Sequence, residues 1–383
     1  MTVTTPKGFR AAGVAAGLKS TGAPDIALLV NDGPRDSAAA VFTSNRCKAN
    51  PVLWSEQAIK AGSARAVAVN SGGANCYTGA EGFETTHRTA ETLARALGVG
   101  AADVQVCSTG LIGMLNVRDD LLDGVTRAAQ ALTADGGQSA AEAIITTDSH
   151  AKQAVVSRNG YTVGAMAKGA GMLAPALATM LVFVTTDADV DAAGCDAALR
   201  ASTRVTFDRL DSDGCQSTND TVLLMASGAS GVVPDPSDFS AAVREACHDI
   251  AMQLLADAEG ADHEITIEVV GAATEDDAVE VGRSVARSNL FKCAIFGRDP
   301  NWGRILASVG TTRAAFDPAD LDVSLNGVPV CRGSAPGEPP DAVDLSQRQV
   351  RVVIDLKSGD ATATVWTNDL TQAYVHENSA YST

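Results

Sequence analysis

The chain has 383 residues, of which 45% are hydrophobic, so it is long enough to bury a large core and to form two domains or more. Its formal net charge of −17 argues against a nucleic acid or an anionic membrane as a partner, because both attract basic surfaces. No apolar run has the length of a membrane-spanning helix, and the first residues lack the apolar core of a signal peptide. We therefore expect a cytoplasmic protein.

The first half of the chain alternates short apolar runs with loops rich in glycine, asparagine and serine. Helical periodicity is found at 81–98, which ends in a glycine, and at about 117–133. Strands are predicted at 25–30, 38–43, 64–70, 104–113 and 161–172. The last two of these ranges end in glycine-rich loops. The pattern is compatible with an α/β protein, but it does not select one fold.

The second half begins with one strand and two helices. Residues 179–187 are apolar and rich in β-branched side chains, which predicts a buried strand. Helices are predicted near 191–203 and at 237–258, with Ser237 as the N-cap of the second. Residues 263–272 alternate between apolar and polar, as a half-buried strand does.

The pattern changes near residue 275, where helical stretches are followed by short strands. Asn326-Gly327 stands between two apolar runs, and this dipeptide strongly favours a β-hairpin. We therefore place a main α/β domain at residues 1–278 and a smaller C-terminal α/β domain at residues 279–383.

The eight cysteines and five histidines show no spacing typical of a metal site. No two cysteines stand at C-x-x-C spacing, and the histidines are scattered along the chain. A chain of this length does not need disulfides for stability, so we expect reduced cysteines. We therefore expect no metal and no cofactor, and a reaction that does not use histidine.

The segment "KGAGMLAPALATMLVFVTTD", residues 168–187, allows three interpretations. Residues 169–174 match the dinucleotide-binding pattern G-x-G-x-x-A, and Asp187 and Asp189 lie near the spacing of a ribose-binding acid. That pattern requires a helix directly after the glycines, however, and Pro175 and the strand-like run leave no room for one. The two other interpretations are a plain loop before a core strand and a site of self-cleavage.

Self-cleavage would occur between Ala178 and Thr179. The Thr179 hydroxyl would attack the Ala178 carbonyl carbon, and hydrolysis of the resulting ester would leave Thr179 with a free α-amine. Such an amine has an ordinary pKa of about 7.7–8.0, so it can act as a base for the neighbouring hydroxyl near neutral pH. The small residue before a threonine and the glycine-rich loop upstream meet the chemical requirements. A plain loop explains the same residues, and the segment alone does not decide between the two.

The segment resembles the cleavage segment of the ornithine acetyltransferases, the bifunctional enzymes of arginine biosynthesis. The resemblance covers essentially the whole chain, because further motifs of that family follow in the same order. They are NSGGAN (70–75), CSTGLIG (107–113), ITTD (145–148), STNDTVLL (217–224), DAEG (257–260), DPNWGR (299–304) and ENSAYST (377–383).

The resemblance implies a fold, an assembly and an activity. The fold would be a layered α/β sandwich of helices and mixed sheets, shared with self-cleaving aminopeptidases, with a smaller C-terminal α/β domain. Cleavage would give an α chain of residues 1–178 and a β chain from residue 179, assembled as α2β2. The enzyme would move the acetyl group of N2-acetylornithine to glutamate, and some members of the family also use acetyl-CoA.

The resemblance also implies the residues of the site. Thr179 would be the nucleophile that carries the acetyl group, and Thr109 and Gly110 would form the oxyanion hole. The residues implied to contact substrate are Thr147, Lys168, Thr179, Glu259, Asn378 and Thr383. In the Thr146-Thr147 pair, we favour Thr147 as the residue that contacts substrate.

Glu259 also stands out on physical grounds, because it follows the predicted helix 237–258. A negative charge at a helix C-terminus costs about 0.3–1 kcal/mol, which suggests a residue kept for function.

Two other functions fit the same residues. An N-terminal-threonine amidase or aminopeptidase would use the same nucleophile and transfer the acyl group to water. A binding protein without catalytic activity would not cleave itself.

Overall fold

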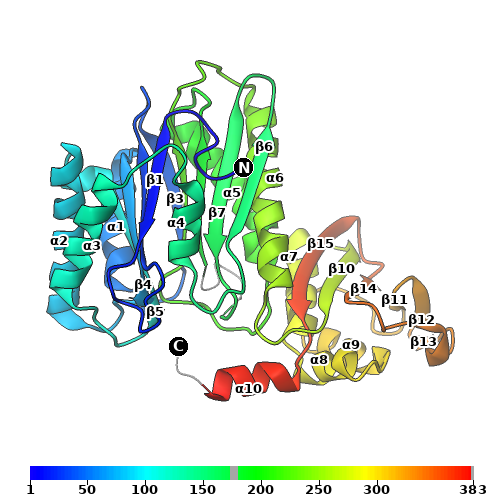
Figure 1. Cartoon of the computed structure of the whole chain (residues 1–383). Helices are drawn as coiled ribbons and strands as arrows, with labels where there is room; N and C mark the ends of the chain where they lie inside the picture. Colours follow the sequence, from blue (N-terminus) through cyan, green and yellow to red (C-terminus); the bar gives the residue numbers. More distant parts are fainter. Residues whose placement is uncertain (173–179, 381–383) are drawn as a thin grey trace.

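The computed structural model describes residues 1–172 and 180–380, which form three β-sheets and the helices around them (Figure 1). The predicted cleavage bond between Ala178 and Thr179 and the predicted substrate contact Thr383 lie outside the described residues. Strands and helices are both distributed along the chain, with runs of consecutive strands at β1–β3, β6–β8 and β11–β13. In the described part of the chain, no helix combines the length and the hydropathy needed to cross a membrane.

The first sheet has four strands in the order β1-β2-β4-β5. They are β1 (Phe9–Val14), β2 (Ile26–Asn31), β4 (Ala66–Gly73) and β5 (Val104–Leu111). Helices cover its outer face, and α4 (Gly137–Ile144) packs on its inner face. The outer helices are α1 (Asn50–Ala58), α2 (Gly79–Leu97) and α3 (Arg118–Gln130). Strand β2 is buried along its whole length because its successive side chains enter the outer and inner clusters in turn.

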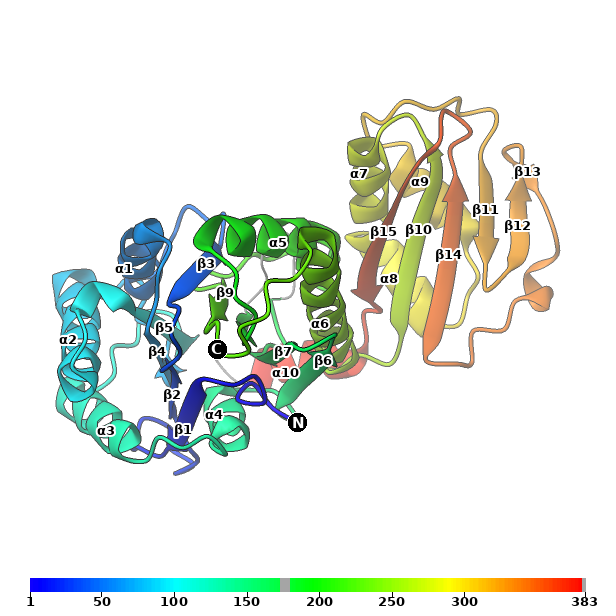
Figure 2. The ribbon, with the colours of Figure 1, turned by 90° about the horizontal axis from the view of Figure 1, so that it is seen from above.

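The second sheet has five strands in the order β3-β9-β8-β7-β6. They are β3 (Ser37–Phe42), β6 (Lys152–Ser157), β7 (Thr162–Lys168), β8 (Leu181–Thr186) and β9 (Thr221–Ala226). Its outer face packs against α5 (Ala192–Val205) and α6 (Pro236–Ala256). Its inner face packs against the first sheet, so the view from above shows a sandwich of helices, two sheets and helices (Figure 2).

The third sheet has six strands in the order β13-β12-β11-β14-β10-β15 and lies beside the sandwich (Figure 2). They are β10 (Glu264–Ala272), β11 (Asp322–Leu325), β12 (Val328–Arg332), β13 (Ala335–Pro336), β14 (Gln349–Asp355) and β15 (Ala361–Asn368). Helices cover one of its faces, so β10 and β14 alternate between buried and less buried side chains. The covering helices are α7 (Glu275–Ala286), α8 (Asn289–Phe296) and α9 (Trp302–Val309).

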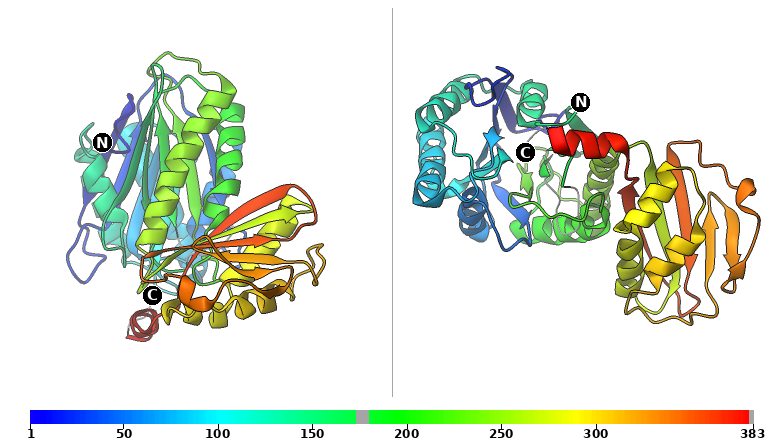
Figure 3. Two further views of the ribbon diagram at one scale, coloured as in Figure 1. Left: turned by 90° about the vertical axis from the view of Figure 1, so that its right-hand side faces the viewer. Right: turned by 90° about the horizontal axis from the view of Figure 1, so that it is seen from below.

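Short 3-10 helices and one final helix complete the described chain. The 3-10 helices are η1 (Ile59–Ala61), η2 (Ala101–Asp103), η3 (Phe207–Arg209) and η4 (Pro340–Ala342). Helix α10 (Gln372–Ala380) leaves the third sheet and crosses the lower end of the sandwich (Figure 3).

The local predictions met different outcomes. The hairpin at Asn326-Gly327 is confirmed, since both residues have positive φ and Leu325 pairs with Val328. The buried strand predicted at residues 179–187 is confirmed as β8, in which all side chains are buried. Ser237 as an N-cap is wrong, because α6 begins at Pro236 and the Asp235 side chain accepts the backbone N–H of Ser237. Proline is favoured at that first helical position because it has no N–H to leave unpaired.

The division into domains at 278/279 stays a prediction. Strand β10, which that division assigns to the first domain, hydrogen-bonds to β14 and β15. Its buried side chains also join the core under the third sheet. We propose that the C-terminal unit begins before β10, near residue 263, and that α10 returns from it to the sandwich.

Phe183 tests the packing between the two sheets. Its ring is 0% exposed in the cluster that they share. We expect Phe183→Ala to lower the free energy of unfolding by about 3–5 kcal/mol because it leaves a cavity in a close-packed layer. Urea denaturation measures this cost. Phe83 of α2 is 39% exposed, so Phe83→Ala is the control, and an equal cost for both variants would contradict the packing described here.

Candidate active site

The two sheets of the sandwich are linked at their lower edge by Lys168 and Thr109. Lys168 is the last residue of β7, Thr109 lies near the end of β5, and the Lys168 ammonium donates to Thr109 Oγ1 at 3.1 Å. Both side chains are almost completely buried. Burial lowers the pKa of Lys168, the positive charge of Lys152 lowers it further, and Asp148 opposes them. Thr109 and Lys168, which the sequence analysis assigned to separate roles, are therefore in direct contact.

Gly110 has a backbone conformation that a strand normally does not adopt. Its φ is +125°, and an added Cβ would lie 2.6 Å from the carbonyl carbon of Gly72, its partner on β4. Only glycine tolerates both the positive φ and the close approach of the neighbouring backbone. The end of β5 thus departs from regular strand geometry at Gly110 while it stays paired with β4.

Glu259 and Thr147 meet across the cavity. The Thr147 hydroxyl donates to Glu259 Oε1 at 2.7 Å, and the Glu259 backbone N–H donates to the carbonyl of Ala170 at 3.0 Å. A Cβ on Gly171 would lie 2.7 Å from the Glu259 carboxylate, so the glycine allows the loop to pass it. Thr146 also lines the cavity, but the assignment of substrate binding to Thr147 stays a prediction.

A buried ion network contacts the backbone at the start of this loop, at Gly169. Lys152 is 0% exposed and donates to Asp148 Oδ1 at 2.7 Å and to Asp257 Oδ2 at 2.6 Å. Asp148 Oδ1 also accepts the backbone N–H of Gly169 at 2.6 Å. Burial alone would raise the pKa of Asp148, but the charges of Lys168 and Lys152 and the Gly169 N–H lower it to about 2. Asp148 is therefore ionised at neutral pH.

Three sequence motifs converge at Asn219. Its side-chain amide donates to the carbonyl of Ala74 at 2.7 Å and to the carbonyl of Ser108 at 2.8 Å. These bonds join the STND loop to the SGGAN loop and to the STGLIG turn. All three loops line the same cavity, which has a volume of about 630 Å³.

That cavity gathers most of the residues that the sequence predicted. Those within the described part of the chain are Thr109, Gly110, Thr147, Lys168, Glu259 and Asn378, and all six line it. Met180, the residue after Thr179, donates its N–H to the buried Asp220 at 3.0 Å, and the next residue, Leu181, pairs with Lys168. Burial raises the pKa of Asp220 well above its ordinary value.

The C-terminal helix α10 contributes two residues, Tyr374 and Asn378, to the cavity wall. An added Cβ on Gly260 would lie 2.2 Å from the backbone nitrogen of Tyr374, so α10 packs directly on the turn after Glu259. Asn378 lines the cavity, and its amide donates to the carbonyl of Tyr374 at 3.0 Å.

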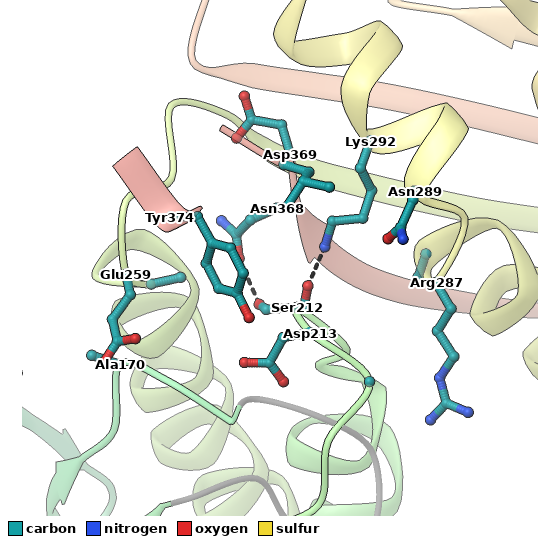
Figure 4. A pocket seen from close by; sticks show the side chains of 14 residues that line it. Ala170, Ser212, Asp213, Glu259, Arg287, Asn289, Lys292, Asn368, Asp369 and Tyr374 are labelled. Carbon is teal, nitrogen blue, oxygen red and sulfur yellow. Dashed lines mark hydrogen bonds between the residues drawn. The ribbon is translucent and has the colours of Figure 1, made fainter. Parts of the chain in front are cut away.

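Tyr374 and Asp213 belong to the cavity but were missed from the sequence. A smaller pocket of about 170 Å³ lies beside the cavity, and Tyr374, Asp213 and Glu259 line both. Figure 4 shows the Tyr374 ring between the two carboxylates. Burial and these two negative charges raise the pKa of Tyr374 to about 12. On the far side of the small pocket, the Lys292 ammonium donates to the carbonyl of Ser212.

The cavity wall thus has acidic and basic parts and a strand end with an unusual backbone conformation at Gly110. Among residues 1–172 and 180–380, no group of three or more histidine, cysteine or acidic side chains is arranged to hold a metal ion. Hydroxyl, ammonium and carboxylate groups instead converge on one space.

The ArgJ family model matches residues 10–383. The chain belongs to the ArgJ family. The family-level resemblance seen in the sequence motifs is thereby confirmed.

Relatives of the ArgJ family cover the whole chain. The protein of Streptomyces coelicolor named arginine biosynthesis bifunctional protein ArgJ is 62% identical over 382 residues, with 100% of both chains covered. That of Mycobacterium leprae, with the same name, is 53% identical over 99% of this chain and 95% of its own. The crystal structure of ArgJ from Bacillus halodurans is 36% identical with a TM-score of 0.50, and it covers 52% of this chain and 98% of its own.

Asp148 makes the free energy of unfolding of this ArgJ-family chain depend on pH between about 2 and 4. Its pKa of about 2 in the folded protein lies below the ordinary value of 3.8, so ionised Asp148 stabilises the fold fully above about pH 4. This contribution, about 2 kcal/mol, is lost as the pH falls from 4 to 2. We therefore expect the difference in free energy of unfolding between wild type and Asp148→Asn to shrink over that range.

Urea denaturation at pH 5 and at the lowest pH that keeps the protein folded measures this difference. The exposed Asp341 provides the control, since Asp341→Asn should differ from wild type by the same small amount at both pH values. A difference for Asp148→Asn that does not change with pH would contradict the assigned ion network.

Proposed function

We propose that the chain cuts itself between Ala178 and Thr179, and that the released Thr179 transfers an acetyl group from N2-acetylornithine to glutamate. The products are ornithine and N-acetylglutamate. Membership of the ArgJ family supports an acetyltransferase of arginine biosynthesis. The observation that carries the proposal is the contact between Lys168 and Thr109, at the sheet edge where the described chain resumes with Met180.

Self-cleavage converts an internal threonine into a nucleophile with its own base. The Thr179 hydroxyl oxygen attacks the Ala178 carbonyl carbon, the C–N bond breaks, and the proton passes to the new α-amine. Water then hydrolyses the ester, which leaves a carboxylate on Ala178 and restores the Thr179 hydroxyl. The free amine can accept the hydroxyl proton in later turnovers.

Transfer proceeds in two half-reactions at the same hydroxyl. Thr179 attacks the acetyl carbonyl carbon of N2-acetylornithine, the amide C–N bond breaks, and the ornithine amine leaves with a proton. The amine of glutamate then attacks the acetyl ester, the C–O bond breaks, and the proton returns to Thr179. Alternation of this kind gives ping-pong kinetics.

Thr109 and Gly110 are proposed to stabilise the oxyanion of each tetrahedral intermediate. Because Thr109 Oγ1 accepts from the Lys168 ammonium, its own hydrogen is left to point elsewhere. The nearby positive charge also favours a developing negative charge. Preorganised donors of this kind commonly contribute several kcal/mol to the stability of the transition state.

The acidic wall suits the ornithine half of the substrate. Glu259, with Asp213 and Tyr374 beside it, presents negative charge and acceptors for an alkylammonium group. Lys168, on the basic side of the cavity, suits an amino-acid carboxylate. We propose Thr147 and Asn378, which also line the cavity, as further substrate contacts.

Chain length in a relative supports the cleavage. Since 52% of this chain accounts for 98% of the Bacillus halodurans ArgJ chain, that chain is about half as long. A cut near the middle of the precursor would produce such a chain. The α2β2 assembly, the cytoplasmic location, the use of acetyl-CoA and the role of Thr383 stay predictions.

Thr179→Ala tests the nucleophile. We expect wild type to give two species in intact mass measured under denaturing conditions, one of them beginning at Thr179. Thr179→Ala should give a single species of 39.1 kDa without transferase activity, because alanine has no hydroxyl. The exposed Thr126 of α3 provides the control, and Thr126→Ala should be cut as wild type is. Normal cleavage of Thr179→Ala would refute the assignment.

Product analysis separates transfer from hydrolysis. With glutamate present, the acetyl group should appear in N-acetylglutamate in the amount of ornithine released. An N-terminal-threonine amidase would instead release acetate at the same rate with and without glutamate.

Lys168→Met tests the basic side of the site. We expect kcat/KM for N2-acetylornithine to fall about 100-fold. The variant removes the ammonium beside Thr109, and it also removes the positive charge proposed to bind the substrate carboxylate. Steady-state kinetics of the cleaved protein measures this loss, and a gel shows whether cleavage still occurs. Lys7→Met, on the N-terminal segment outside the cavity, should behave as wild type. Unchanged kinetics of Lys168→Met would remove Lys168 from the site.

A further inference from the structure

Lys19 lies in the wall of the large cavity on a loop that is held in place from within. The loop joins β1 to β2 and folds around Asp25, which is 0% exposed. The Asp25 carboxylate accepts the backbone N–H groups of Ala16 at 2.6 Å, Leu18 at 2.6 Å and Lys19 at 3.2 Å. Three backbone bonds to one buried carboxylate fix the path of the loop and therefore the position of Lys19.

The Lys19 ammonium is anchored by carbonyl groups rather than by a carboxylate. It donates to the carbonyl of Pro24 at 2.7 Å and to that of Ala143, in the last turn of α4, at 3.4 Å. Within residues 1–172 and 180–380, no carboxylate oxygen lies within 4.0 Å of its nitrogen. An ammonium has three N–H donors, so one remains for a ligand. Burial lowers the pKa of Lys19, Asp25 opposes this, and the charge of Lys168 lowers the pKa further.

Lys168 is the second ammonium of the same wall. It donates to Thr109 Oγ1, and it too has no ion pair within 4.0 Å among the residues that the structure describes. A cavity in a chain of net charge −17 thus carries two lysines that form no direct ion pair among the described residues, although Asp25 and Asp148 act on them from a longer distance. A ligand that carries negative charge would compensate the burial of these two ammonium groups more directly than the distant carboxylates do.

The two substrates of the proposed reaction differ in the number of carboxylates that they carry. N2-acetylornithine carries one carboxylate and one side-chain ammonium, whereas glutamate carries two carboxylates. One lysine and the acidic wall at Glu259 satisfy the first substrate. The second substrate needs another cation.

We propose that Lys19 binds the side-chain carboxylate of the acceptor glutamate and so determines acceptor specificity in the second half-reaction. This inference rests on the proposed function. Lys168 remains available to the α-carboxylate, which both substrates share. Lys19 therefore distinguishes glutamate from amino acids with neutral side chains, and it does not contribute to the release of ornithine.

The test uses the cleaved full-length protein and measures the half-reactions separately. Ornithine release from N2-acetylornithine reports the first, and kcat/KM for the acceptor reports the second. We expect Lys19→Met to lower kcat/KM for glutamate about 10- to 100-fold, because a charged hydrogen bond is lost. Its rates of ornithine release and of transfer to glutamine should stay within about threefold of wild type, so the preference for glutamate over glutamine should collapse.

Companion variants separate charge from folding. Lys19→Gln removes the charge but keeps a donor for the two carbonyls, and it should lose the preference for glutamate as Lys19→Met does. Lys19→Arg should keep most of the preference. Lys60→Met, which removes an exposed lysine hydrogen-bonded to Gln57, is the matched control and should equal wild type.

An unchanged glutamate-to-glutamine ratio in Lys19→Gln would overturn the inference. Equal losses in both half-reactions would also overturn it, because Lys19 would then act on the shared carboxylate or on the fold. Failure of the proposed function would look different. Wild type would then transfer no acetyl group to any acceptor, and the inference would fall with it.

Discussion

The site depends on one buried ammonium group. Lys152 holds Asp148 and Asp257 together in the interior, and through them it joins β6, the loop before it, the end of α6 and the backbone of Gly169. Removing either partner from such a buried ion network leaves an uncompensated charge, which typically costs 3–5 kcal/mol. The network anchors the 146–150 loop, which carries Thr147, and the C-terminal end of α6, which precedes Glu259, next to the backbone of Gly169.

Around this network the chain builds a cavity with separated charges. The loop between β1 and β2 and the end of β7 contribute ammonium groups, while the turn after α6 and the C-terminal helix contribute acidic and phenolic groups. A protein with an overall negative charge can therefore bind anionic amino acids, because the local field near a buried lysine outweighs distant surface charges that salt screens. The same separation lets one cavity serve a substrate with a cationic side chain and another with an anionic one.

Only part of the site could be predicted from the sequence. The motifs pointed to Thr109, Lys168 and Glu259, and the structure brings all three to one cavity. Lys19 and Tyr374 could not be found in this way, because nothing in their neighbouring residues distinguishes them from solvated side chains. Their positions depend on Asp25 and on Gly260, whose packing is decided far from the motifs.

The sequence by itself determined the elements whose cause is local. The hairpin at Asn326-Gly327 follows from two residues that accept positive φ, and β8 follows from an apolar, β-branched run that suits burial on both faces. Only the tertiary structure decided the contacts between distant segments. Lys152 meets Asp257 across 105 residues of sequence, and Asn219 ties together loops from both sheets. Such contacts depend on how the sheets stack, which the sequence does not report. Strand β10 is another example, because its alternating pattern predicts a strand but does not reveal that it pairs with β14 in the third sheet. Periodicity reports which face of an element is buried, but it carries no information about the partner that buries it.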